Sequence, residues 1–288
     1  MSRRIPRIIL IPVALLNVWA VALSCSTILE DRSDCPCILT VNTSEIPKVT
    51  GTPFPVESGN LAIDLISEEG SPVLVQKAVK DMETRGKDEY GTRIPRGIAT
   101  ICSSIGGTHY RSTSDNRAKV LAEGYEADSI FVHHSVVDCS GETAYDTLKV
   151  HKEWCTVTIH LAGGIPGKRY SFGINGKWNG FSTGAPAVPV EGSFRCETRQ
   201  LSGNIFQARV PRQGDDSLIL DFHEDDGMGM HKYRIASFPL GEIIYKTGFD
   251  WLRRDLYDVD ITIDRSSMEI GIEVCPWYSG LNLGDMEL

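Results

Sequence analysis

Short runs of alternating apolar and polar residues recur along most of the chain. The cleanest is residues 155–161, in which Cys155 is followed at every second position by Val, Ile and Leu and the residues between are Thr or His. Near the end, alternation over residues 258–264 is answered by alternation over 268–274 across a short polar turn. Period-two alternation is typical of half-buried β-strands, and two such runs around a turn predict a hairpin.

Weaker runs of the same kind fill the rest of the sequence. Strands are predicted over residues 37–43, 60–66, 71–82, 98–102, 129–137, 146–150, 170–174, 192–198, 204–210 and 217–223. Two short helices are predicted over residues 114–124 and 239–248, because capping residues and a terminating glycine enclose apolar positions at helical spacing. Many short strands with few helices and no βαβ rhythm predict an all-β fold of two tandem antiparallel β-sandwiches.

The first 25 residues follow a different pattern. Three arginines within the first seven residues precede apolar residues 8–21, and Ser24 stands directly before Cys25. This is the layout of a secretory signal. A small residue before a cysteine resembles a bacterial lipobox, in which the thiol is acylated and becomes the mature N-terminus. A plain secretory signal and a single membrane-anchor helix are the alternatives, although a span needs roughly 20 apolar residues.

These patterns divide the 288 residues into four parts. Residues 1–24 are predicted to be a lipoprotein signal peptide, 25–36 a polar tether, 37–151 one sandwich and 152–288 a second. We expect lipidation at Cys25. Ser26, which follows it, is not the aspartate that favours inner-membrane retention in known lipoproteins, so the outer membrane is the expected location.

Charge narrows the range of partners. The whole chain carries a net charge of −9, and removing the three arginines of the signal leaves −12. A distributed negative charge argues against binding to nucleic acid or to an anionic membrane surface. Membrane contact would then depend on lipid, and two or more acyl chains are needed for stable anchoring.

Seven cysteines follow Cys25, and exported proteins live where disulfides persist. At most three bridges can form among Cys35, Cys37, Cys102, Cys139, Cys155, Cys196 and Cys275, and the sequence leaves their connectivity open. The Cys35-Pro36-Cys37 spacing lacks a second cysteine pair for a metal site. We expect one of its two cysteines to bond to a distant cysteine and to hold the first strand.

Several stretches could carry chemistry, and each has a simpler structural interpretation. Residues 180–184 match the G-x-S-x-G nucleophile pattern around Ser182, but two prolines follow where a helix should begin, so a glycine-rich loop is expected. The acidic window 221–227 lacks EF-hand spacing and is predicted to be a hairpin tip. The aspartates of 258–264 are predicted to mark the solvent face of a strand. His133 and His134 would point to opposite faces of a strand, so no catalytic residue, metal site or cofactor is predicted.

The tryptophans leave one alternative open. Trp154, Trp178, Trp251 and Trp277 could stack on sugar rings if they lay together on one exposed sandwich face. Core or edge positions are the commoner use of tryptophan in sandwiches. A surface lipoprotein that binds glycans through a β-sandwich is therefore the alternative function.

Four stretches in order resemble the fimbrial anchor subunits of the Bacteroidota, the lipoproteins that hold type V pili of the fimbrillin class. They are residues 25–36 with Glu30-Asp31 and Cys35-Pro36, residues 94–97 (Ile-Pro-Arg-Gly), residues 148–158 with Lys152 and Cys155, and residues 251–264 followed by a final strand. The resemblance implies two transthyretin-like Greek-key sandwiches and a non-enzymatic adhesion protein. It also implies that acylated Cys25 fixes the chain in the outer membrane, exposed at the cell surface.

The partner implied by this resemblance is a fimbrillin stalk subunit. A sandwich with an unpaired edge can accept an extended strand, with main-chain hydrogen bonds giving affinity. We therefore expect strand complementation at an edge of one domain or at the tail beyond Val274.

Overall fold

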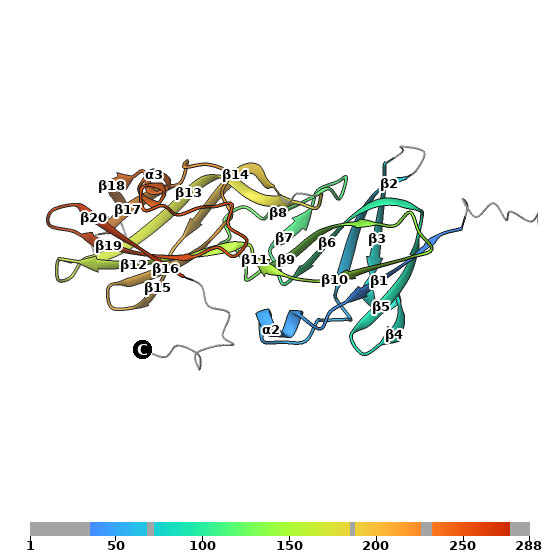
Figure 1. Ribbon diagram of the computed structural model, residues 1–288. Coiled ribbons are helices and arrows are strands. Elements are labelled where there is room, and N and C mark those ends of the chain that lie inside the picture. Colours follow the sequence, from blue (N-terminus) through green and yellow to red (C-terminus); the bar gives the residue numbers. More distant parts are fainter. Residues whose placement is uncertain (1–34, 68–71, 185–187, 226–231, 277–288) are drawn as a thin grey trace, which may run out of the picture. The chain divides into compact units, whose positions relative to one another are not determined.

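A computed structural model describes residues 35–67, 72–184, 188–225 and 232–276 (Figure 1). Cys25, the signal peptide and most of the tether lie outside these residues, as does Trp277. The described residues from Pro36 onward belong to one unit of the chain. They contain four β-sheets, so the all-β prediction is confirmed.

Two sheets enclose the first hydrophobic core. Sheet A has the order β10 (Thr143–Thr147), β1 (Cys37–Asn42), β5 (Glu89–Ile94) and β4 (Glu83–Gly86). Sheet B has the order β11 (His151–Lys152), β9 (Phe131–Asp138), β6 (Gly97–Ile105), β2 (Asn60–Ser67) and β3 (Pro72–Ala78). Alternate residues of β1 and β2, such as Leu39 and Ile63, are fully buried in one cluster. A short helix, α2 (Ile46–Thr50), and a 3₁₀ turn, η1 (Val79–Asp81), complete this sandwich.

Two further sheets enclose the second core. Sheet D has the order β15 (Arg199–Ser202), β16 (Ile205–Pro211), β12 (Trp154–Ala162), β19 (Asp258–Asp264) and β20 (Glu269–Cys275). Sheet C has the order β18 (Lys232–Phe238), β17 (Ile219–Asp225), β13 (Arg169–Ser182), β8 (Ala118–Leu121) and β7 (Tyr110–Ser112), with β14 (Pro189–Glu197) also paired to β13. Helix α3 (Leu240–Lys246) confirms the helix predicted over residues 239–248. Phe172 and Phe206 meet edge to face in this core, with 5.0 Å between their ring centroids.

The two sandwiches repeat the same pairing scheme. β1 pairs parallel with β10 and antiparallel with β5, and β12 pairs parallel with β19 and antiparallel with β16. In the other sheet of each sandwich, β2 pairs with β3 on one side and β6 on the other, and β13 pairs with β14 and β17 in the corresponding way. The repeat differs in two places. β20 covers the outer edge of β19, whereas no described strand covers the outer edge of β10.

The second difference is the β7–β8 hairpin, which follows β6 in sequence but pairs with β13 of sheet C. The helix predicted over residues 114–124 is therefore wrong, because cross-strand pairing of Lys119 with Phe181 overrides the helical spacing. The hairpin lies before residue 152 in the sequence but pairs with sheet C of the second sandwich. The domain boundary between residues 151 and 152 therefore stays a prediction.

Two loop predictions are also corrected. Gly180, Phe181 and Ser182 form the end of β13 and are not a glycine-rich loop. A Cβ on Gly180 would lie 2.2 Å from the carbonyl oxygen of Lys119, so glycine is needed here for close strand approach. Residues 221–225 of the acidic window belong to β17, and Glu224 is buried and paired with Arg265 at 3.1 Å. Residues 226 and 227 lie outside the described residues.

Candidate functional site: a buried ion network beside an open cavity

Arg212, which directly follows β16, is the centre of a buried ion network. Its side chain is 9% exposed, and its Nε donates to Oε2 of Glu153 at 2.7 Å. Its remaining donors reach four backbone carbonyl oxygens, those of Lys152, Trp251, Arg253 and Arg254. Because a guanidinium stays charged in proteins, its burial requires every donor to be satisfied. The segment between α3 and β19 supplies most of these acceptors.

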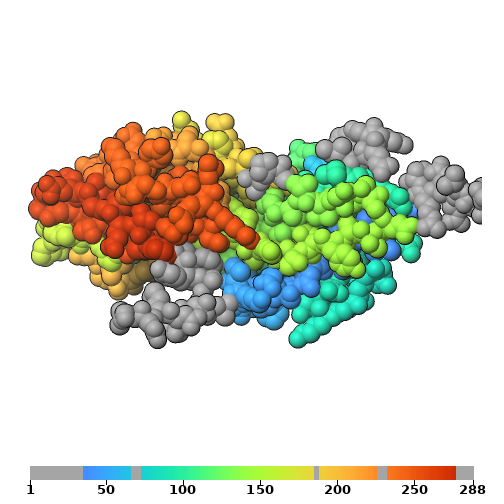
Figure 2. Space-filling model, in the orientation of Figure 1, coloured from blue at the N-terminus to red at the C-terminus, as the bar shows by residue number. Residues whose placement is uncertain are grey.

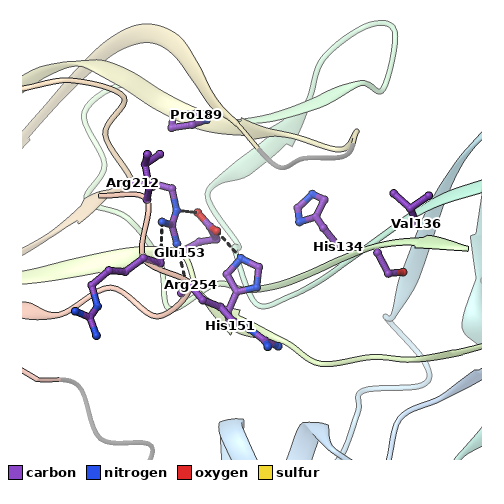
Figure 3. A pocket seen from close by; sticks show the side chains of 10 residues that line it. His134, Val136, His151, Glu153, Pro189, Arg212 and Arg254 are labelled. Atoms are coloured by element: carbon purple, nitrogen blue, oxygen red, sulfur yellow. Dashed lines mark hydrogen bonds and ion pairs between the residues drawn. The ribbon is translucent and has the colours of Figure 1, made fainter. Parts of the chain in front are cut away.

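Glu153 lies between the side chains of Arg212 and His151, as Figure 3 shows. The side chain is 2% exposed, and His151 Nε2 lies 2.8 Å from Oε1 while Arg212 binds Oε2. Burial raises the pKa of Glu153, but the hydrogen bond from His151 and the charge of Arg212 outweigh it, so the pKa lies below its usual value. Glu153 is therefore ionised at neutral pH and balances Arg212.

Lys152 forms a second buried ion pair beside the first. Its side chain is 1% exposed, and Nζ donates to Oδ1 of Asp258 at 2.5 Å. The same carboxylate oxygen accepts the backbone N–H of Thr156 at 2.6 Å. The prediction that the aspartates of 258–264 only mark a solvent face is therefore wrong for Asp258, which is held by Lys152 and by β12.

An open cavity of about 540 Å³ lies against this network (Figure 3). Its lining includes His134 and Val136 of β9 together with His151, Glu153, Arg212 and Arg254. A second cavity of about 570 Å³ shares His134, His151 and Arg254 and extends to Tyr145 and Lys149. The two cavities are therefore adjacent, and together their lining extends from the ion network to the edge strand β10.

His133 and His134 make separate contacts, as their predicted opposite orientation requires. His133 accepts the backbone N–H of Lys149 at Nδ1, so Nε2 carries the proton directed at Asp146, 2.9 Å away. His134 Nε2 lies 3.0 Å from the carbonyl oxygen of Ser182 and donates to it. Burial lowers the pKa of His134 to about 4, although the Ser182 hydrogen bond acts in the opposite direction.

Ser182 of the G-x-S-x-G pattern is bound through both its backbone and its hydroxyl. His134 contacts the carbonyl oxygen of Ser182, and the Ser182 hydroxyl accepts the backbone N–H of Val188 at 3.1 Å. Within the ranges that the structure describes, no group of three or more metal-ligating side chains is present. Nor does any helix in those ranges have the length and apolar character to cross a bilayer.

The three tryptophans that the structure describes, Trp154, Trp178 and Trp251, do not form a common exposed face. Trp154 and Trp251 are 6% and 7% exposed, and Trp178 is half-buried against Gly214. Trp154 meets Phe131 edge to face at 5.0 Å. The core interpretation of Trp154 and Trp251 is confirmed, and the sugar-stacking arrangement is absent from these three residues.

Sequence reasoning missed Lys152, Glu153 and Arg212 as a unit. The only local signal was the charged pair Lys152-Glu153 directly before a strand that begins Trp154-Cys155. Their partners lie far away in sequence, 59 residues for Glu153 and Arg212 and 106 for Lys152 and Asp258. Periodicity cannot reveal a pair at such a separation.

Three solved structures with the same fold are described as a fimbrial anchor protein, a proposed polysaccharide-binding protein and a proposed adhesin. The fimbrial anchor protein Mfa2 from Porphyromonas gingivalis aligns with a TM-score of 0.53 at 13% identity, over 84% of this chain and 98% of that one. A proposed polysaccharide-binding protein from Bacteroides thetaiotaomicron gives 0.54 at 13% identity, over 83% and 95%. A proposed adhesin from Bacteroides ovatus gives 0.51 at 11% identity, over 84% and 94%.

At these identities the comparison concerns the fold. No protein-family model and no curated protein matches the chain. The chain nevertheless shares the β-sandwich fold of the fimbrial anchor protein over nearly the whole length of that protein. The resemblance to fimbrial anchor subunits is thus confirmed in the fold.

We expect Arg212→Met to lower the free energy of unfolding by about 3–5 kcal/mol, because it leaves Glu153 buried without its main partner. The matched control is Arg209→Met on the same strand β16, where Arg209 and Glu126 are each 31% exposed. Loss of that exposed pair should cost about 0–1 kcal/mol. Urea unfolding followed by circular dichroism measures both. Equal losses in the two variants would contradict the role of the buried network.

Because the pKa of His134 is lowered in the fold, we expect the folded protein to lose stability in mild acid. Its pKa of 6.5 in an unfolded chain falls to about 4 in the fold, so the unfolded state binds the extra proton between these values. Stability is complete above pH 6.5 and falls as the pH drops towards 4, by on the order of 3 kcal/mol. His134→Gln keeps an N–H for the Ser182 carbonyl but does not titrate. Its melting temperature should fall less over this pH range, and an unchanged slope would refute the assignment.

Proposed function

We propose that this chain is the anchor subunit of a fimbria, a non-enzymatic outer-membrane lipoprotein that holds the first stalk subunit. The observation that carries this proposal is the shared two-sandwich fold over 98% of the length of a fimbrial anchor protein. The cavity is compatible with it, since Arg212 and Glu153 in its lining form a satisfied ion network. The other solved structures with this fold are described as adhesion or polysaccharide-binding proteins.

The membrane end of the chain is proposed to be Cys25. An apolar run and a small residue precede this cysteine, and β1 begins only twelve residues later, at Cys37. A diacylated or triacylated cysteine provides the two or more chains that stable anchoring needs. The short polar tether would then hold the first sandwich close to the membrane surface.

The stalk end is proposed to be the outer edge of β10 in sheet A. In the second sandwich the equivalent strand, β19, is covered by β20, whose Ile270, Ile272 and Val274 pack on the core. Within the described residues β10 has no such neighbour. An extended strand of the stalk subunit could occupy the position that β20 occupies in the repeat.

The backbone of β10 is oriented for this addition. Ile38 N–H donates to the carbonyl of Glu142, and Leu148 N–H donates to that of Asn42. In a parallel pair the donors alternate, so Ala144 and Asp146 direct their N–H groups at β1. The N–H and C=O groups of Tyr145 then face outward, and its side chain is 72% exposed. This edge offers a row of main-chain hydrogen bonds to a partner strand.

We expect Cys25→Ala to abolish incorporation of labelled palmitate and to release fimbriae into the medium, because the acylated thiol is the proposed attachment. The matched control is Cys35→Ala, ten residues further on, whose side chain is exposed. It should keep both the label and the attachment. Palmitate labelling and immunoblots of cell and medium fractions measure these outcomes, and label retained in Cys25→Ala would defeat the proposal.

We expect Tyr145→Pro to abolish co-purification of the stalk subunit, because proline removes an outward N–H and leaves the hydrogen bonds to β1 in place. Tyr145→Ala is the control, since it removes the same side chain and keeps the N–H. It should retain most of the bound stalk subunit. Equal binding by the two variants, with equal melting temperatures, would place the acceptor edge elsewhere.

A further inference from the structure

Cys37 and Cys139 come together where the chain passes between sheets A and B. Cys37 is the first residue of β1, and Cys139 directly follows β9. Both residues are completely buried, and their thiols are hydrogen-bonding partners. About 100 residues of chain separate them, so the contact is a product of the fold.

Backbone pairing fixes this approach on both sides. Cys37 pairs with Ile94, the last residue of β5, and the N–H of Cys139 donates at 2.8 Å to the carbonyl of Gly97, the first residue of β6. Residues 94–97 form the turn from sheet A to sheet B. The two cysteines therefore flank one corner of the sandwich.

The chain after Cys139 closes the same corner from the other side. It reaches Glu142, whose carbonyl accepts the N–H of Ile38 at 2.9 Å, and then enters β10 beside β1. Residues next to both cysteines are thus joined by main-chain hydrogen bonds. Little backbone movement is available to separate the sulfur atoms.

We propose that Cys37 and Cys139 form a disulfide bond in the exported protein, joining the first strand after the tether to the opposite sheet. The structure holds all seven described cysteines as thiols, so the bond requires an oxidant. We assign this role to a protein disulfide of the compartment outside the inner membrane. The bond itself takes only the export of the chain from the proposed function, and its use under tension also takes the lipid anchor.

The oxidation balances as a thiol–disulfide exchange. A thiolate of the pair attacks one sulfur of the oxidant's disulfide and displaces the other sulfur. The second cysteine then attacks the mixed disulfide, which forms the Cys37–Cys139 bond and releases the oxidant as a dithiol. The oxidant gains the two electrons and two protons that the pair loses.

Burial affects when this exchange can occur. It raises the pKa of Cys37, and it raises that of Cys139 to about 12, so neither thiol is a ready nucleophile once the corner is packed. We therefore expect the disulfide to form during folding, before this corner of the sandwich is packed. The finished bond would also be shielded from reductants, because both residues are completely buried.

The bond would have a direct use in an anchor. Cys37 is the first residue of β1 after the tether, so tension on the lipid-anchored end is first applied at this point. Without the bond, tension would peel β1 away from β5 and β10. With it, tension would pass covalently to Cys139 and β9.

The test begins with protein extracted from cell membranes. Thiols are blocked with N-ethylmaleimide under denaturing conditions, and peptides are mapped by mass spectrometry without reduction. We expect one linked peptide pair containing Cys37 and Cys139. A Cys35–Cys139 link, or maleimide on both Cys37 and Cys139 in protein with an acylated N-terminus, would overturn the proposal.

A second arm separates this proposal from export. The purified full chain is denatured, reduced and refolded in a mixture of reduced and oxidised glutathione, where the same linked pair should form. Its absence here overturns the disulfide. Linkage after refolding, together with unlinked thiols in cell-derived protein whose N-terminus is not acylated, supports the disulfide and defeats export.

The stability of the oxidised protein gives an independent readout. Protein that is reduced while denatured and then refolded in reductant should melt about 5–15 °C below the oxidised protein, given the long loop that the bond closes. A Cys37→Ala/Cys139→Ala variant should not respond to reductant. The control Cys196→Ala, which removes another buried thiol, should respond as the unchanged protein does. An equal response in the double variant would contradict the bond.

Discussion

The permanent charge of Arg212 is the constraint on which the second sandwich depends. A buried guanidinium must find an acceptor for each donor, and those acceptors are Glu153 and four backbone carbonyls. Meeting this requirement fixes the segment between α3 and β19 against the start of β12. β12 in turn pairs with β16 and β19 in the centre of sheet D. The ion network thus holds the segment before β19 against the start of β12.

The two sandwiches share one pairing scheme, and the differences between them coincide with their proposed roles. The β7–β8 hairpin leaves the first sandwich's order and extends sheet C. β20 closes the edge of sheet D, while in the described chain the matching edge at β10 is open. In the space-filling view the red atoms of the β19–β20 hairpin lie at the surface (Figure 2). A repeat with one edge closed and one open suits a protein that ends a fibre.

The sequence predicts most strands because each sandwich buries one face of each sheet. The alternation over residues 155–161 became β12, and the final hairpin became β19 and β20. The helix expected over residues 114–124 failed because local capping signals carry no information on the pairing of β8 with β13. The prediction that Asp258 faces solvent failed for a related reason, since alternation cannot show that Lys152 forms an ion pair with it. The predicted staple of the first strand has a candidate partner only now that the fold brings Cys139 to Cys37.

We propose that the chain is attached through Cys25 and offers the outer edge of β10, in the first sandwich, to the fibre. The attachment is the central claim, and mass spectrometry of the mature N-terminus tests it most directly. We predict an N-terminal peptide that begins at Cys25 and carries a diacylglycerol with a further acyl chain. An unacylated N-terminus on protein recovered from the cell surface or the medium would contradict the account.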